Sequence, residues 1–105
     1  MKLKKVDIEW DQLGFDAIDT RSMFIATCVN GNSWEGGSLV PYGKIELSPA
    51  AGVLNYGQGV FEGTKAYHTS KDNIVLFRID RNAERMVWST ERLCIPKMDI
   101  NFFKS

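Results

Sequence analysis

The sequence predicts an α+β fold, in which an antiparallel sheet made of hairpins packs with one or two helices. Two hairpin patterns predict the sheet: a run of strand formers ends in Asn30-Gly31-Asn32, and two short apolar runs flank a polar turn over 70–73. A third observation predicts a helix, because apolar residues recur at helical spacing between Asp80 and Pro96. With 105 residues, the chain corresponds to one domain or less.

The first twenty residues have no lasting apolar period, so 1–20 are expected to form an irregular lead-in and 21–105 the domain itself. The run 22–30 is rich in strand formers, and 38–40 would belong to its return strand. A turn is expected over 41–43. The alternation of polar and apolar residues over 44–47 then predicts a half-buried strand.

The next elements are a possible cap and a second hairpin. Ser48 and Pro49 have the pattern of an N-cap followed by proline at the first helical position, although the glycines beyond them leave room for little helix. The runs 65–69 and 74–78 predict the strands of the second hairpin.

The last elements are helical. Asp80 is the predicted N-cap of the clearest helix, which Pro96 ends. Asp99 is the predicted N-cap of a final amphipathic helix that stops after about one turn. Because Phe102 and Phe103 belong to this short piece, the chain is expected to be cut before its natural end.

Composition excludes several classes of partner. Thirteen basic and thirteen acidic residues cancel, which argues against nucleic acid or an anionic membrane as the main partner. No apolar run approaches the ~20 residues of a membrane span. The basic start lacks an apolar signal core, and Asp7 and Glu9 come too early for a transit peptide, so a cytoplasmic location is expected.

The chain offers few residues for metal or nucleophilic chemistry. Cys28 and Cys94 lie far apart among apolar neighbours and are expected to be buried, reduced thiols. His68 is the single histidine, so neither a multi-histidine metal site nor a histidine-based catalytic pair is expected.

The stretch 54–67 is the most informative in the chain, because it combines three glycines, three aromatic residues and one carboxylate, Glu62. Two readings of equal weight remain: the wall of a small-molecule pocket, or a tight helical turn that leads into a buried strand. Its glycine spacing is one residue too long for a dinucleotide fingerprint, and a strand rather than a helix follows it.

Two basic residues have both structural and functional readings. Arg85 lies opposite the apolar stripe of its helix, so as a solvated arginine it would pair with Glu84 or Glu91. Lys65 could be a desolvated catalytic lysine, but a structural pair with Glu62 or Glu46 is the better interpretation.

Five segments keep a common order and spacing: 45–49, 54–67, 76–78, 82–86 and 92–96. Together they strongly resemble the branched-chain amino acid aminotransferases, which are fold-type IV enzymes that use pyridoxal 5′-phosphate. The resemblance runs from about Trp10 to the end of the chain. It implies that the fold is the small N-terminal domain of such an enzyme.

The resemblance also implies roles for individual residues. Arg85 matches the arginine that binds the cofactor phosphate. Tyr56 and Phe61 match aromatic residues that line the pocket for the branched side chain of the substrate, and Gly63 matches the glycine that keeps the backbone close to it. Lys65 matches a structural basic position and is not expected to be catalytic.

The implied activity is amino transfer between leucine, isoleucine or valine and 2-oxoglutarate, in a homodimer. The Schiff-base lysine of the family lies in a second domain, past residue 105, so this chain holds no expected catalytic residue and is incomplete alone. Two alternatives remain open. One is a non-catalytic truncated domain, and the other is a related activity of the D-amino acid aminotransferase or aminodeoxychorismate lyase type.

Overall fold

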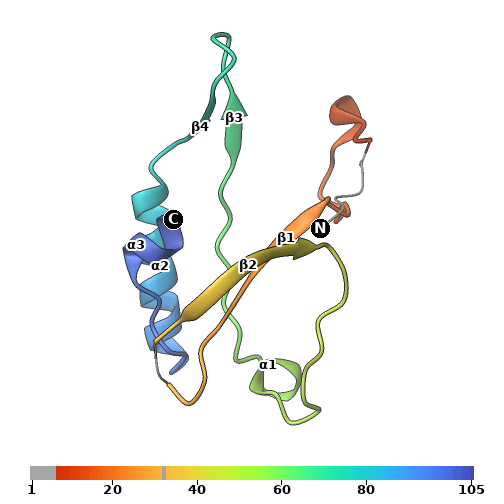
Figure 1. Ribbon diagram of the computed structural model, residues 1–105. Helices are drawn as coiled ribbons and strands as arrows, with labels where there is room; N and C mark the ends of the chain where they lie inside the picture. The colour runs from red at the N-terminus through yellow and green to blue at the C-terminus, as the bar shows by residue number, and fades with distance from the viewer. Residues whose placement is uncertain (1–6, 32) are drawn as a thin grey trace.

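Figure 1 shows the computed structural model, which describes residues 7–31 and 33–105. Two hairpins and a long helix dominate it, and shorter helical segments connect or end them. In chain order the elements are η1 (Trp10–Gln12), β1 (Ser22–Thr27), β2 (Glu35–Pro41), α1 (Gly52–Asn55), β3 (Ala66–His68), β4 (Ile74–Leu76), α2 (Ile79–Arg92) and α3 (Ile100–Lys104).

The first hairpin forms because its turn residues tolerate a left-handed backbone. Asn30 and Gly31 have φ angles of 54° and 71°, as the predicted Asn-Gly turn requires. β1 and β2 pair antiparallel, with Ser22 opposite Pro41 and an irregular register between Ile25 and Thr27. The predicted first strand was too long, since β1 ends three residues before the turn. Asn32 and the first six residues of the predicted lead-in lie outside the described part of the chain.

The second hairpin confirms the predicted strands over shorter ranges. β3 and β4 pair antiparallel with Tyr67 opposite Val75. In Figure 1 this hairpin extends away from the first one, beyond the start of α2. Within the described residues the two hairpins form separate two-stranded sheets. The α+β class therefore holds, but the expected joint sheet of two or three hairpins does not form.

Helix α2 confirms the predicted periodicity, but its ends differ from the prediction. Ala83 and Thr90 on the apolar stripe are buried. The helix begins one residue before Asp80, so Asp80 lies in its first turn and Arg78 occupies the N-cap with a φ of 50°. At the other end, the helix stops at Arg92, before the predicted Pro96, and Cys94 just beyond its C-cap has a left-handed φ of 54°.

The middle of the chain differs most from the prediction. Residues 44–47 form no strand, and Ile45 and Leu47 are 61% and 50% exposed, because no neighbouring strand edge pairs with this segment among the described residues. Ser48 does accept a hydrogen bond from the Ala50 amide at 3.2 Å. It caps no helix, however, because α1 begins only at Gly52.

Long-range contacts attach the first hairpin to the end of the chain. The rings of Phe24 on β1 and Phe102 on α3 lie 6.5 Å apart between centroids, tilted by 58°. The Trp34 indole donates from Nε1 to the carbonyl oxygens of Pro96 and Lys97, at 3.3 and 3.0 Å. These contacts place the α2–α3 connection beside the end of the first hairpin.

The protein has an open shape with little core. It exposes 9352 Å², whereas a compact monomer of this length exposes about 6000 Å². Its radius of gyration is 15.9 Å, against about 13 Å for a compact domain. Ala83 is the single buried apolar residue among those described. The expected burial of both cysteines is also wrong, since Cys28 is half-buried and Cys94 is exposed.

Candidate functional site

The glycine-rich segment 56–64 is fastened to helix α2 by a polar network around Glu62. The Glu62 carboxylate accepts from Arg85 twice, from Nε at 3.1 Å and from Nη2 at 2.6 Å. It also accepts from Asn82 Nδ2 at 2.9 Å. The same Asn82 nitrogen donates to the carbonyl oxygen of Gly63 at 2.7 Å. In Figure 1 this segment connects α1 to β3 and passes beside α2.

The local sequence explains this geometry. Asn82 and Arg85 are three residues apart, so both reach the same neighbouring segment from α2: Asn82 from the buried edge of the apolar stripe and Arg85 from the exposed side. Gly57 has a φ of 62° directly after the C-cap of α1, where a left-handed residue turns the chain out of the helix. The chain then runs on to bring Glu62 against α2.

The hydrogen bonds of this ion pair outweigh the effect of burial on Glu62. The side chain of Glu62 is only 12% exposed, whereas that of Arg85 is 52% exposed. Hydrogen bonds from Arg85 hold the pKa of the Glu62 carboxyl below its ordinary value, although its burial works in the opposite direction. The same hydrogen bonds raise the pKa of Arg85. Both groups are therefore charged at neutral pH.

Arg85 keeps donors that can bind an anion. A guanidinium has five N–H groups, and the bonds to Glu62 use one on Nε and one on Nη2. The two N–H groups of Nη1 donate to no residue within the described ranges. A planar pair of donors on a half-exposed cation matches the oxygens of a phosphate. The donor chemistry at Arg85 thus fits the phosphate of pyridoxal 5′-phosphate.

The other predicted site residues lie on the same segment. Tyr56 and Phe61 are 87% and 88% exposed, which is unusual for large rings without a partner. Gly63 is joined to Arg85 through Asn82 and Glu62. A Cβ atom at Gly63 would meet only the Phe61 ring, at an ordinary 3.8 Å, so packing within the described residues does not require a glycine there.

The ion pairs differ from those expected for solvated basic residues. Arg85 pairs with Glu62, while Glu84 pairs with Arg81 at 2.7 Å and Glu91 pairs with Lys97. The Lys65 ammonium lies over the ring of Tyr67, 5.4 Å from its centroid. The expected pairing of Lys65 with Glu62 is therefore wrong, because Arg85 occupies that carboxylate.

Sequence reasoning missed Asn82 and the Glu62–Arg85 pair. Asparagine is a weak helix former, yet Asn82 lies within the predicted helix, one turn before Arg85. This position could have indicated that its side chain binds a neighbouring segment, and the structure shows that it is buried. Glu62 is a carboxylate placed between an aromatic residue and a glycine. Its partner lies 23 residues away, which local patterns do not indicate.

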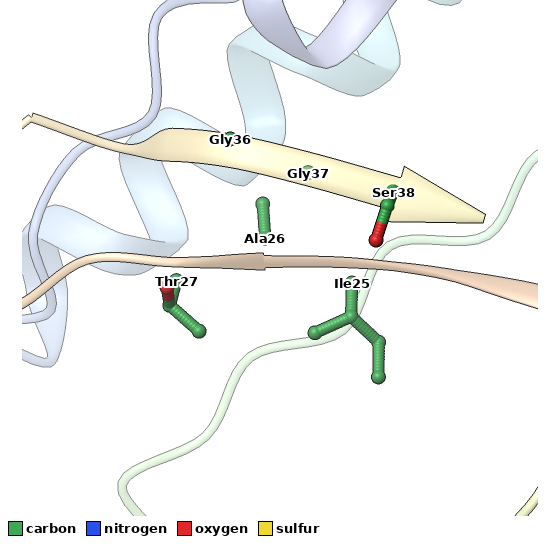
Figure 2. A pocket seen from close by; sticks show the side chains of 6 residues that line it. All are labelled: Ile25, Ala26, Thr27, Gly36, Gly37 and Ser38. Carbon is green, nitrogen blue, oxygen red and sulfur yellow. The ribbon is translucent and has the colours of Figure 1, made fainter. Parts of the chain in front are cut away.

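A hollow of about 350 Å³ lies on the first hairpin, away from this network. Figure 2 shows that Ala26 points toward Gly36 and Gly37 of β2, whereas Ile25 and Thr27 point to the other side. The hydroxyls of Thr27 and Ser38 line the hollow, but no carboxylate, histidine, lysine or cysteine does, so no general base adjoins them there.

The described residues contain neither a metal-ligand cluster nor a membrane-spanning helix. Residues 7–31 and 33–105 contain no cluster of three or more histidine, cysteine, aspartate or glutamate side chains suited to a metal ion. Within the same ranges, no helix has the length and apolar character needed to cross a membrane.

Comparison with known proteins gives a consistent result. The chain is 50% identical to a chloroplastic branched-chain amino acid aminotransferase 2 of Humulus lupulus over 97 residues, which are 92% of this chain and 24% of the relative. It is 48% identical to a branched-chain-amino-acid aminotransferase 6 of Arabidopsis thaliana, covering 95% of this chain and 28% of that protein.

A methionine aminotransferase of Arabidopsis thaliana is 38% identical over 97% of this chain and 29% of its own length. No known protein-family profile matches the chain. The chain spans about a quarter of the length of the curated relatives it matches. Over more than nine-tenths of its residues, the chain is thus a homologue of the branched-chain amino acid aminotransferases and corresponds to a portion of such a protein.

Proposed function

We propose that this chain supplies one wall of the active site in a pyridoxal 5′-phosphate-dependent aminotransferase. The reaction exchanges the amino group between leucine, isoleucine or valine and 2-oxoglutarate. One observation carries the proposal: a chain homologous to these enzymes presents a half-exposed, fixed arginine, Arg85, beside its glycine-rich segment.

Each residue has a distinct role in this proposal. Arg85 holds the cofactor phosphate through its remaining N–H groups. When bound, the cofactor supplies the electron sink that this type of chemistry needs. Tyr56 and Phe61 offer exposed rings to the branched side chain of the substrate and exclude water from it. Gly63 leaves space for a substrate beside the backbone.

The fold and the open surface support a larger assembly. We infer that the hairpins and α2 form the small domain of a fold-type IV enzyme. The exposed apolar surface would then be buried against the remainder of such a protein and a second copy in a homodimer. The cytoplasmic location expected from the sequence stays a prediction.

The side chain of the substrate admits a second candidate. The 38% identity to a methionine aminotransferase favours a second candidate, in which the same wall receives a straight thioether side chain instead of a branched one. A related activity of the D-amino acid aminotransferase or aminodeoxychorismate lyase type is a further alternative, as is a domain without catalysis.

A chimera tests the proposed function. The matching quarter of the Humulus lupulus relative is replaced by this chain, and cofactor affinity and the KM values for leucine and methionine are measured. We expect amino transfer from leucine to persist. Arg85→Ala should weaken cofactor binding by about tenfold, the size of a lost charge-assisted contact. Tyr56→Ala should raise the KM for leucine while leaving cofactor affinity within about twofold.

Arg81→Ala is the matched control, because Arg81 is an exposed arginine on the same helix that pairs with Glu84. It should leave cofactor affinity unchanged. A folded chimera that binds cofactor but transfers amino groups only from methionine would support the second candidate. Equal cofactor affinity in Arg85→Ala and Arg81→Ala would contradict the phosphate assignment.

A further inference from the structure

We propose that Glu62 is a positioning residue of the phosphate site, and that it fixes the Arg85 guanidinium so that its remaining N–H groups meet a phosphate in one orientation. This inference rests on the proposed function of Arg85 and extends it to a residue that does not itself touch the ligand. Its basis is the side-on, two-bond contact between the two side chains.

The geometry of that contact decides which donors remain. The bonds from Nε and Nη2, at 3.1 and 2.6 Å, occupy the side edge of the guanidinium. Because the group is planar, fixing this edge also fixes the direction of the Nη1 donors. An arginine side chain that is already ordered loses less conformational entropy when an anion binds.

Glu62 is itself held in place, which a positioning residue requires. Its side chain is 12% exposed, and Asn82 donates to it at 2.9 Å. Asn82 is 8% exposed and also donates to the Gly63 carbonyl oxygen at 2.7 Å. The carboxylate is therefore attached to both the helix and the glycine-rich segment, while Arg85 extends from it toward solvent.

Glu62 could instead weaken the binding of a phosphate at Arg85. Glu62 carries a negative charge, so it also repels a phosphate and competes for Arg85. The repulsion is weakened by solvent, since the Arg85 side chain is 52% exposed. The competition is limited because Glu62 occupies only one edge of the guanidinium. If Glu62 orders Arg85, neutralising Glu62 lowers the affinity for a phosphate. If Glu62 competes with the phosphate, the same change raises that affinity.

The experiment compares two probes, pyridoxine 5′-phosphate and pyridoxine, on the cofactor-free form of the chimera described above. Neither has an aldehyde, so neither condenses with surface lysines, and the ratio of their affinities reports the phosphate contact alone. The ratio is measured calorimetrically for the chimera without a further substitution, Glu62→Gln, Arg85→Ala and the double variant. Glu84→Gln is the control, because it removes an equal charge from an ion pair on the same helix.

We expect Arg85→Ala to lower the affinity ratio by about tenfold. Glu62→Gln should lower it by about threefold or more, and should have no further effect in the Arg85→Ala background, as for two residues that act as one unit. Glu84→Gln should leave the ratio unchanged. In NMR spectra, the Arg85 Nε–H signal should lose its protection from exchange in Glu62→Gln, with or without ligand.

Other outcomes distinguish the positioning role of Glu62 from the phosphate-binding role of Arg85. If Arg85→Ala lowers the ratio but Glu62→Gln raises it or leaves it unchanged, the positioning role is wrong and the phosphate site stands. If Glu62→Gln weakens both probes equally, its role is only structural. If Arg85→Ala leaves the ratio unchanged, or the chimera without a further substitution binds neither probe, the proposed function fails, and the positioning role fails with it.

Discussion

The ring of Phe24 on β1 lies against the backbone of Gly37 on β2, at a place where no side chain fits. A Cβ atom built on Gly37 would lie 2.1 Å from Phe24 Cζ. Gly37 also has a φ of 45°, in the left-handed region that favours glycine. The pair thus joins an aromatic ring and a glycine across the two strands of the first hairpin.

We expect Gly37→Ala to lower the free energy of unfolding by about 2 kcal/mol or more, because it adds overpacking to backbone strain. Urea unfolding followed by tryptophan fluorescence measures the change. Gly36→Ala is the matched control, because Gly36 has a φ of 66° but a Cβ atom built on it would meet no described atom within 4 Å. It should cost only about 1 kcal/mol. Equal losses of unfolding free energy in the two variants would show that the Phe24 ring moves aside without lowering stability.

A second prediction concerns the cap of α3. Asp99 Oδ1 accepts from the amides of Asn101 and Phe102, at 2.8 and 3.2 Å. Asp99→Ala should destabilise this five-residue helix by about 1 kcal/mol and accelerate hydrogen exchange at both amides. Asp99→Asn keeps an accepting oxygen and should change exchange little. If alanine and asparagine gave the same exchange rates, the helix would depend on other contacts, such as the Phe24–Phe102 ring pair.

Features with a local cause were predictable from the sequence. The Asn30-Gly31 turn follows from backbone conformations that few residues adopt. Asp99 was identified as an N-cap because a cap and its amides are adjacent in sequence. The period of α2 located two of its three buried residues, Ala83 and Thr90, and placed Arg85 on the opposite side.

Features that depend on distant partners were not predictable. The alternation over 44–47 indicates a strand only if a neighbouring edge is present, and the described structure provides none. The sequence offered nearby Lys65 or backbone amides as partners of Glu62, whereas Arg85 binds it from 23 residues away. The family resemblance predicted site roles for Arg85, Tyr56, Phe61 and Gly63, but it did not indicate what holds Arg85 in place.

Arg78 and Asp80 form a two-bond ion pair at the start of α2. Arg78 donates from Nε and Nη2 to the two carboxylate oxygens, at 3.0 and 2.9 Å. The hydrogen bonds lower the pKa of Asp80 from 3.8 to about 2, against a smaller opposing effect of burial. Since the folded state has the lower pKa, the contribution to stability is complete well above pH 3.8 and is lost as the pH falls through 3.8 toward 2.

We therefore expect the difference in free energy of unfolding between the wild type and Asp80→Asn to be constant above about pH 5 and to shrink below pH 3.8. Urea unfolding at pH 6, 4 and 2.5 measures this difference. The Glu62 pKa is also lowered, but both proteins retain Glu62, so its titration cancels in the comparison. In an Arg78→Met background the pH dependence of the difference should largely disappear. A difference that stays constant down to pH 2.5 would mean that the pair does not lower the pKa of Asp80, and that the helix start is held by backbone contacts alone.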